Sequence, residues 1–191
     1  ALTILQLHRP GAAVVYTGHP VIMDMRSGIS AFGFAEIGLL AAACVELGRF
    51  YGLPTASDGV TADSCAPDAF AASEKWASGY LPLMAGANIN GGAGALASQS
   101  TISLEQLVID DEIYGNMLRH AQGIRVDEET LAGELIQRIG PGGSFLPEEH
   151  TLEHYRREVW YSRLGARQSA PSWEAAGSKD VLQRAHELVR R

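Results

Sequence analysis

The residues best suited to chemistry lie in a polar, acidic loop at positions 56–68, which contains the carboxylates of Asp58 and Asp63 and the thiol of Cys65. Carboxylates and thiols are groups that enzymes use for acid–base and nucleophilic steps. We therefore predict Asp58, Asp63 and Cys65 as catalytic candidates. The alternatives are that the aspartates only cap the next helix and that Cys65 is a small buried hydrophobic residue, since no His stands nearby in the sequence to favour its thiolate.

The sequence around this loop predicts a strand before it and a helix after it. Residues 50–55 can lead into a short buried strand. Pro67 has a φ suited to the first helical position, and Asp68 places a carboxylate at the positive end of the helix dipole. A loop between a strand and a helix often carries the chemistry of an α/β enzyme, and a capped turn with no further role is the alternative.

Two further loops contain candidate residues. The nearly continuous apolar run at 12–16 predicts a strand buried in a parallel sheet, and His19 lies in the loop that follows it. Asn88 and Asn90 belong to another short predicted strand, ahead of the glycine cluster at 91–94. These glycines let a backbone pass close to another group, but they lack the spacing of a dinucleotide loop and the Lys of a P-loop.

The remaining elements predict an α/β fold. Apolar periodicity indicates helices at 34–50, 67–86 and 127–140 and a peripheral helix at 178–191. Another helix begins at 103 with the pattern of a capping box and carries apolar residues as far as 118. Strand, loop and helix alternate three to four times, which is typical of a parallel sheet. A complete eight-stranded barrel needs about 250 residues. We interpret residues 1–191 as a single domain that forms only the second half of one.

Other polar clusters have plainer interpretations. His150 and His154 have the spacing of metal ligands on a helix, but the preceding Glu148 and Glu149 do not give the H-E-x-x-H order. We expect a solvated or capping role for both histidines and no metal site. The acidic residues 110–112 are expected to form a solvated helix face.

Composition excludes several classes of function. The chain has 191 residues, 46% of them hydrophobic, which is enough to bury a sizeable core. Its net charge of −7 argues against nucleic acid as a partner, and no run of about eighteen apolar residues suggests a membrane span. The N-terminal residues do not have the pattern of a signal peptide. Two cysteines do not form a disulfide framework, so we expect a cytoplasmic protein.

Several blocks of the sequence occur in a recognisable order. They are Arg9–Ala12 with Tyr16–Gly18, Ala56–Asp58 with Asp63–Asp68, Glu74–Lys75, Gly86–Asn88, Ser103–Asp110, Gly140–Leu146, His150–Thr151 and Trp160. Together they resemble the trimethylamine methyltransferase family over nearly the whole chain. Family members are about twice as long or more, with the matching blocks in their C-terminal half, so the resemblance also implies a fragment.

The resemblance implies a fold and a reaction. The fold would be the C-terminal half of a TIM-type (β/α)8 barrel with parallel strands, which holds a methylated amine at the strand ends. The methyl group would pass to the cobalt of a reduced corrinoid that a separate corrinoid protein supplies. No cofactor is expected to stay bound to this chain, no residue is assigned to one, and a homo-oligomer is a further expectation.

The chemistry of such a substrate selects residue types. A quaternary ammonium has no proton to donate, so aromatic faces and carboxylates must hold it. The aspartates of the central loop suit this task, as do the rings of Tyr16 and Trp160 unless they belong to the core. A betaine adds a carboxylate, to which His or Asn side chains can donate. The predicted substrate-binding residues are Tyr16, His19, Asn88, Asn90 and Trp160.

One departure from the family pattern bears on the substrate. Well-known members carry pyrrolysine in or close to their Asp-Ser loop, whereas this chain has Asp63, Ser64 and Cys65 there. The chain is therefore similar to the branch without pyrrolysine, which includes enzymes that demethylate glycine betaine. Two hypotheses stand: a corrinoid-dependent methyltransferase, and a barrel segment that binds a small cationic or zwitterionic ligand without methyl transfer.

Overall fold

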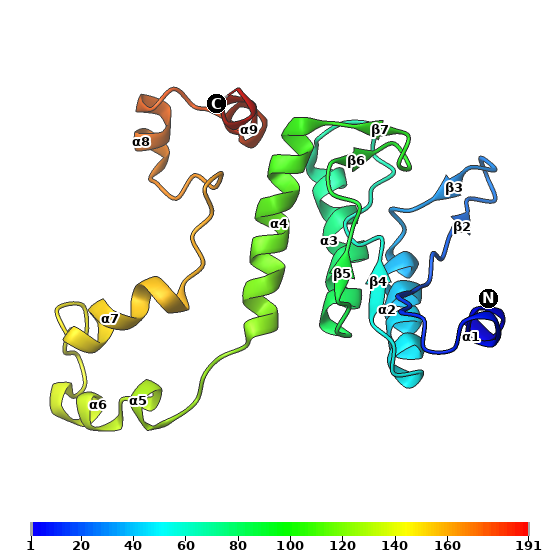
Figure 1. The fold of residues 1–191 in the computed structure, drawn as a ribbon. Coiled ribbons are helices and arrows are strands. Elements are labelled where there is room, and N and C mark those ends of the chain that lie inside the picture. Colours follow the sequence, from blue (N-terminus) through cyan, green and yellow to red (C-terminus); the bar gives the residue numbers. More distant parts are fainter. Residues whose placement is uncertain (1, 191) are drawn as a thin grey trace.

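A small parallel sheet lies at the centre of the computed structural model, which describes residues 2–190 (Figure 1). Its strands are β1 (Tyr16–Thr17), β4 (Thr55–Ser57) and β5 (Ile89–Asn90), with β4 in the middle. Tyr16 pairs with Thr55, and Ala56 pairs with Ile89, both in parallel register. The predicted α/β class with parallel strands is confirmed. The predicted strand at 12–16 is wrong in extent, since only Tyr16 of that run belongs to a strand.

Each strand of the sheet is followed by a long helix. These helices are α2 (Ala35–Phe50), α3 (Ala69–Met84) and α4 (Leu104–Gln122), which confirm the helices predicted at 34–50 and 67–86 and the one predicted to begin at 103. Helix α2 contacts β1, β4 and α3, while α3 contacts β5 and α4. The helices therefore form a layer on one side of the sheet (Figure 1).

Side-chain caps fix where two of these helices begin. Asp68 is the N-cap of α3 and accepts a hydrogen bond from the backbone N–H of Ala71 at 2.8 Å. Pro67 therefore precedes the cap, and its prediction as the first helical residue is wrong by two positions. Ser103 caps α4 in the same way, but the Gln106 side chain does not reach back to it, so the predicted capping box is not formed.

Hairpins extend two of the loops that leave the sheet. Strands β2 (Ile22–Met23) and β3 (Ser30–Ala31) pair in the connection between β1 and α2. Strands β6 (Ala95–Leu96) and β7 (Thr101–Ile102) pair between β5 and α4. Both hairpins lie in loops that leave the carboxyl ends of parallel strands.

The rest of the chain consists of shorter helices. They are α1 (Leu2–His8), α5 (Glu128–Leu131), α6 (Gly133–Ile139), α7 (Glu149–Glu158), α8 (Ala170–Ala175) and α9 (Val181–Val189). The segment from α5 to α8 extends away from the sheet, and α9 returns to α4 (Figure 1). The single helix predicted at 127–140 is two helices, because Ala132 has a φ of 49°.

The C-terminal helix is part of the core. Ala185 of α9 is fully buried in a cluster with Ile109 of α4 and with Leu164. The prediction of a peripheral helix at 178–191 is therefore wrong. No helix within residues 2–190 has both the length and the apolar character needed to cross a membrane.

Candidate functional site

Three loops meet at the carboxyl edge of the sheet. They leave β1, β4 and β5 and comprise residues 18–34, 58–68 and 91–103. Because the strands are parallel neighbours, their carboxyl ends lie along one edge, which is where open α/β sheets bind ligands. The predicted site residues lie in these loops or in the strands before them, except for Asn88, which directly precedes β5, and Trp160.

Asp63 ties the three loops together. Its Oδ1 accepts hydrogen bonds from the N–H of Phe32 at 2.8 Å and from the hydroxyl of Ser98 at 2.8 Å. Its Oδ2 accepts from the N–H of Gly33 at 2.9 Å. Both carboxylate oxygens therefore already have partners in the protein. The structure gives Asp63 a positioning role, and its predicted catalytic role stays a prediction.

Asp58 of the central loop contacts a predicted residue from another loop. Its Oδ2 contacts Nδ1 of His19 from the first loop, and the side chains of His19 and Asp58 are 51% and 34% exposed. The His19 ring also meets Phe32 edge-on, with ring centroids 5.8 Å apart. The structure thus brings together two predicted residues from different loops and leaves Nε2 of His19 outside the contact with Asp58.

Cys65 lies in the same loop with its side chain exposed. Its sulfur is 4.0 Å from the backbone oxygen of Asp63, and it is a free thiol. The alternative of a small buried residue is wrong for Cys65. The structure does not test its predicted catalytic role.

Asn88 and Asn90 have different environments, although only one residue separates them. The Oδ1 of Asn88 accepts from the N–H of Thr55 at 2.9 Å, so this side chain links the start of β4 to the start of β5. The side-chain oxygen and nitrogen of Asn90 are both covered, yet neither has a hydrogen-bond partner within the described part of the chain. Buried amide atoms normally have partners. Asn90 therefore has hydrogen-bonding capacity to offer at the carboxyl end of β5.

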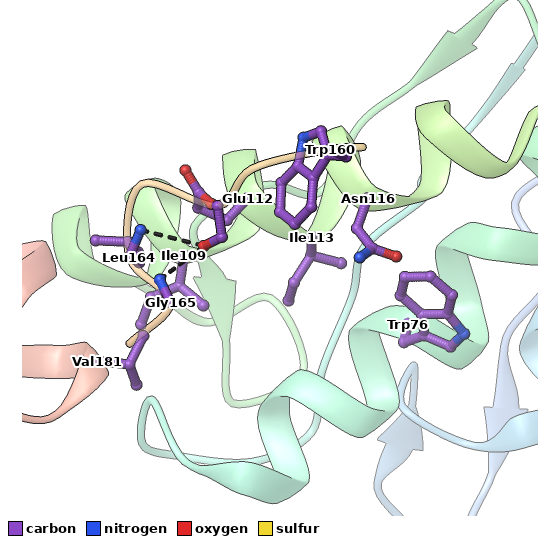
Figure 2. A pocket seen from close by; sticks show the side chains of 10 residues that line it. Trp76, Ile109, Glu112, Ile113, Asn116, Trp160, Leu164, Gly165 and Val181 are labelled. Atoms are coloured by element: carbon purple, nitrogen blue, oxygen red, sulfur yellow. Dashed lines mark hydrogen bonds between the residues drawn. The ribbon is translucent and has the colours of Figure 1, made fainter. Parts of the chain in front are cut away.

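The two predicted aromatic residues lie elsewhere. The ring of Tyr16 packs toward α2, where a Cβ at Gly48 would come within 3.0 Å of its Cδ1. Trp160 packs on Gly115 of α4 and lines an apolar pocket of about 330 Å³ together with Trp76 of α3 (Figure 2). No other predicted site residue lines that pocket. The structure does not bring either ring to the pair formed by His19 and Asp58.

A buried ion pair joins α3 and α4 next to the loops, and it was not predicted from the sequence. Nζ of Lys75 in α3 is 2.8 Å from Oδ2 of Asp110 in α4, and both side chains are 0% exposed. The expectation that residue 110 belongs to a solvated face is wrong. Burial raises the pKa of the Asp110 carboxyl and lowers the pKa of the Lys75 ammonium, while the pair and its hydrogen bonds oppose both changes. The spacing of Gln106 and Asp110, four residues apart on the buried side of α4, was the sequence signal that could have indicated a buried Asp110.

One cavity beside Asp58, on the helix side of the sheet, is very small. It measures about 10 Å³ and is lined by Pro20, Phe32, Ser57, Asp58 and neighbouring residues. A space of this size holds about one water molecule. A methylated amine therefore does not fit in this cavity.

Comparison with known proteins places the chain in a family. The sequence model described as trimethylamine methyltransferase (MTTB) matches residues 1–191. The chain belongs to the trimethylamine methyltransferase family. The resemblance predicted from the sequence blocks is thereby confirmed.

Individual family members show how much of their length is matched. A trimethylamine methyltransferase of Methanosarcina barkeri is 42% identical over 191 residues, which cover 98% of this chain and 38% of that protein. A trimethylamine methyltransferase of Desulfitobacterium hafniense (strain DCB-2) is 37% identical over 187 residues, covering 98% and 38%. A glycine betaine methyltransferase of Desulfitobacterium hafniense (strain Y51) is 36% identical, covering 97% and 39%. The chain spans about two-fifths of the length of these relatives.

The histidine pair in this member of the trimethylamine methyltransferase family lies on α7. The rings of His150 and His154 in α7 lie 4.3 Å apart between centroids. Nε2 of His150 is 2.9 Å from the backbone oxygen of Glu129, and Nε2 of His154 is 3.2 Å from its carboxylate. Within residues 2–190, no group of three or more His, Cys, Asp or Glu side chains is placed to hold a metal ion. Both histidines connect α7 to α5.

Proposed function

We propose that a protein containing this chain transfers a methyl group from a methylated amine, with a quaternary amine as the preferred substrate. Family membership over residues 1–191 supports the reaction class, and the relatives are named for trimethylamine and for glycine betaine. The observation that carries the proposal is the meeting of His19 and Asp58 at the carboxyl edge of the sheet. This is the edge at which a substrate site is expected.

The proposed architecture is part of a TIM-type barrel. The sheet has three parallel strands in the order β1, β4, β5, and each is followed by a long helix on the same side. A strand followed by a helix is the repeating unit of such a barrel. Strands β1 and β5 form the two edges of the sheet in the described chain. We infer that further strands pair with these edges and that the amine binds at the carboxyl ends of the strands.

The site residues suit a betaine better than trimethylamine. A quaternary nitrogen makes no hydrogen bond, so the carboxylate of Asp58 would attract it by charge alone. A betaine also carries a carboxylate, to which His19 and the amide of Asn90 can donate. The Asp58 carboxylate accepts from Nδ1–H of His19, so Nε2 carries a proton to donate only when the imidazole is charged. Trimethylamine has no carboxylate to accept from these donors.

The methyl acceptor is proposed to belong to a partner protein. A reduced corrinoid, when bound by such a partner, would supply a nucleophilic cobalt for the methyl group. The role of this chain is to hold the amine so that the C–N bond can break with its electron pair staying on nitrogen.

An amine panel tests the proposal. The complete protein is incubated with cob(I)alamin and with glycine betaine, carnitine, choline or trimethylamine, and the loss of the cob(I)alamin absorbance is followed. We expect methylation with a betaine, and we expect His19→Ala and Asn90→Ala to raise KM for that betaine about tenfold or more. His150→Ala, which removes a histidine of α7, is the control and should leave KM unchanged.

The same panel separates the alternative function. Calorimetric titration of the wild-type protein with each amine measures binding without requiring turnover. Affinity without loss of cob(I)alamin would favour a ligand-binding protein and would contradict methyl transfer. Neither binding nor turnover with any of the four amines would overturn the proposed substrate class.

A further inference from the structure

Side chains of α4 that are spaced four residues apart bind the loop that follows β5. Oδ2 of Asp110 accepts from the N–H of Gly94 at 2.6 Å, while its Oδ1 accepts from the Gln106 amide at 2.7 Å. The hydroxyl of Tyr114 donates to the backbone oxygen of Gly91 at 2.7 Å. Residues four apart share one helix face. The two ends of the glycine cluster at 91–94 are therefore fixed to one face of α4.

Side chains of α3 bind the loop that follows β4 in a similar way. Oε2 of Glu74 accepts from the N–H groups of Asp63 and Ser64 at 2.9 and 3.0 Å. The Ser78 hydroxyl bonds to both the N–H and the C=O of Thr61, each at 3.1 Å. Nζ of Lys75 donates to the backbone oxygen of Val60 at 3.1 Å. The backbone of residues 60–64 is therefore bound to three side chains of α3.

The pair formed by Lys75 and Asp110 joins these two supports. Lys75 and Asp110 bind each other, and each also binds a loop. Lys75 binds the loop that follows β4, and Asp110 binds the loop that follows β5. A buried ion pair often adds no stability over a well-packed apolar pair. Its distinctive effect here is geometric, because it fixes the two loops relative to one another.

The two loops also touch directly. A Cβ at Gly92 would collide with the backbone oxygen of Asp58, and a Cβ at Gly59 would collide with the Tyr114 hydroxyl. Both glycines have positive φ, 64° at Gly59 and 81° at Gly92. The glycine cluster predicted to approach another group closely therefore approaches the central loop.

We propose that Lys75, Asp110 and Tyr114 are positioning residues that set the distance between Asp58 and Asn90 in the amine site. Val60, held by Lys75, is two residues from Asp58, and Gly91, held by Tyr114, follows Asn90 directly. A small shift of either loop therefore moves a ligand-binding side chain. The effect on amine binding rests on the proposed function, whereas the coupling of the loops rests on the contacts alone.

Removal of the Tyr114 hydroxyl tests this role with little change in shape. In the complete protein, Tyr114→Phe keeps the ring and removes its hydrogen bond to the oxygen of Gly91, which still accepts from the N–H of Val60 at 3.2 Å. Tyr80→Phe in α3 is the matched control, since that ring stacks on Trp76 with centroids 5.2 Å apart and its hydroxyl makes no hydrogen bond within residues 2–190. Calorimetric titration with the betaine that the wild type binds gives both Kd and stoichiometry.

The two readouts distinguish positioning from loss of folded protein. We expect Tyr114→Phe to raise Kd about tenfold at unchanged stoichiometry and to lower kcat, because misplacement of a binding group by about 1 Å can cost a hundredfold in rate. Tyr80→Phe should change neither value. A merely structural role would lower the stoichiometry and leave Kd unchanged, and either that result or wild-type behaviour of Tyr114→Phe would overturn the proposal.

A second variant covers the case in which Tyr114→Phe does not fold. The double substitution Lys75→Met with Asp110→Leu replaces the ion pair by apolar side chains and should raise Kd in the same way. Wild-type turnover with unchanged Kd in the double variant would reject the positioning role and leave the proposed function standing. If the wild type binds a betaine but transfers no methyl group, the proposed methyl transfer is rejected, and the change in Kd still tests the positioning role. If the wild type binds no amine at all, the proposed function and the positioning role are both rejected.

Discussion

At the scale of single residues, the structure separates two aspartates that look alike in the sequence. Asp63 accepts three hydrogen bonds from other loops, whereas Asp58 contacts only one predicted residue, His19, and remains a third exposed. The partners of Asp63 lie about thirty residues away on either side. Sequence reasoning could select both carboxylates from their loop position, but it could not tell which one has free oxygens.

Asp63→Asn tests the positioning role of this carboxylate. The substitution puts an NH₂ group where an oxygen now faces an N–H of Phe32 or Gly33, so at least one hydrogen bond is lost in a partly buried place. We expect the free energy of unfolding to fall by about 1–3 kcal/mol in urea denaturation. Asp111→Asn, which removes an exposed partner of Arg163, should cost less than about 1 kcal/mol. Equal effects of the two variants would contradict the role.

Tyr114 should be visible in an alkaline titration. Burial raises its pKa from 10 to about 12, so the folded protein favours the neutral phenol. The resulting stability is present below pH 10 and is lost as the pH rises from about 10 to 12, by at most about 3 kcal/mol at 1.4 kcal/mol per unit. Absorbance at tyrosinate wavelengths should therefore lose a transition near pH 12 in Tyr114→Phe. An unchanged titration near pH 12 would show that the hydroxyl is not buried as described.

At the scale of elements, helices α3 and α4 act as supports for the loops. Their positions could be predicted from apolar periodicity and from Asp68 and Ser103, because both signals are local in sequence. The inward orientation of Asp110 could not, since an acidic run predicts a solvated face unless its distant partner Lys75 is known. The hairpins in the loops were also missed, because strands of two residues carry almost no periodic signal.

The buried ion pair gives a prediction at this scale. Lys75→Met alone leaves the charge of Asp110 buried without its partner, so we expect a loss of about 3–5 kcal/mol in the free energy of unfolding. Adding Asp110→Leu should recover most of this loss, because an apolar pair of similar volume carries no desolvation cost. Chemical denaturation of the wild type, the single variant and the double variant measures the effect. A double variant less stable than the single one would contradict the assigned pairing.

At the scale of the whole molecule, the chain exposes a large surface for its size. Its accessible surface is 12358 Å², whereas a compact monomer of 20.4 kDa is expected to expose about 8,800 Å². Large apolar side chains such as Met25, Phe50 and Phe70 are among the exposed residues. The parallel β/α order could be predicted from the sequence because strand, loop and helix signals alternate. The path of α5 to α8 could not, because few of their side chains are buried.

This exposed surface predicts low stability for the isolated chain. Apolar burial is the main stabilising contribution to folding, and here much of it is missing. We expect residues 1–191 alone to unfold at low temperature or in a broad transition, as followed by circular dichroism. The complete protein is the control and should melt cooperatively at a higher temperature. A sharp, high-temperature transition of the isolated chain would contradict this expectation.

The most direct test of the central claim follows the methyl group itself. Glycine betaine with deuterated N-methyl groups is incubated with the complete protein and a reduced corrinoid, and both products are analysed by mass spectrometry. The account predicts one deuterated methyl group on the corrinoid for each dimethylglycine formed, with product formation weakened in His19→Ala. Betaine that binds but keeps all three labelled methyl groups would contradict methyl transfer from this substrate and would favour a protein that only binds it.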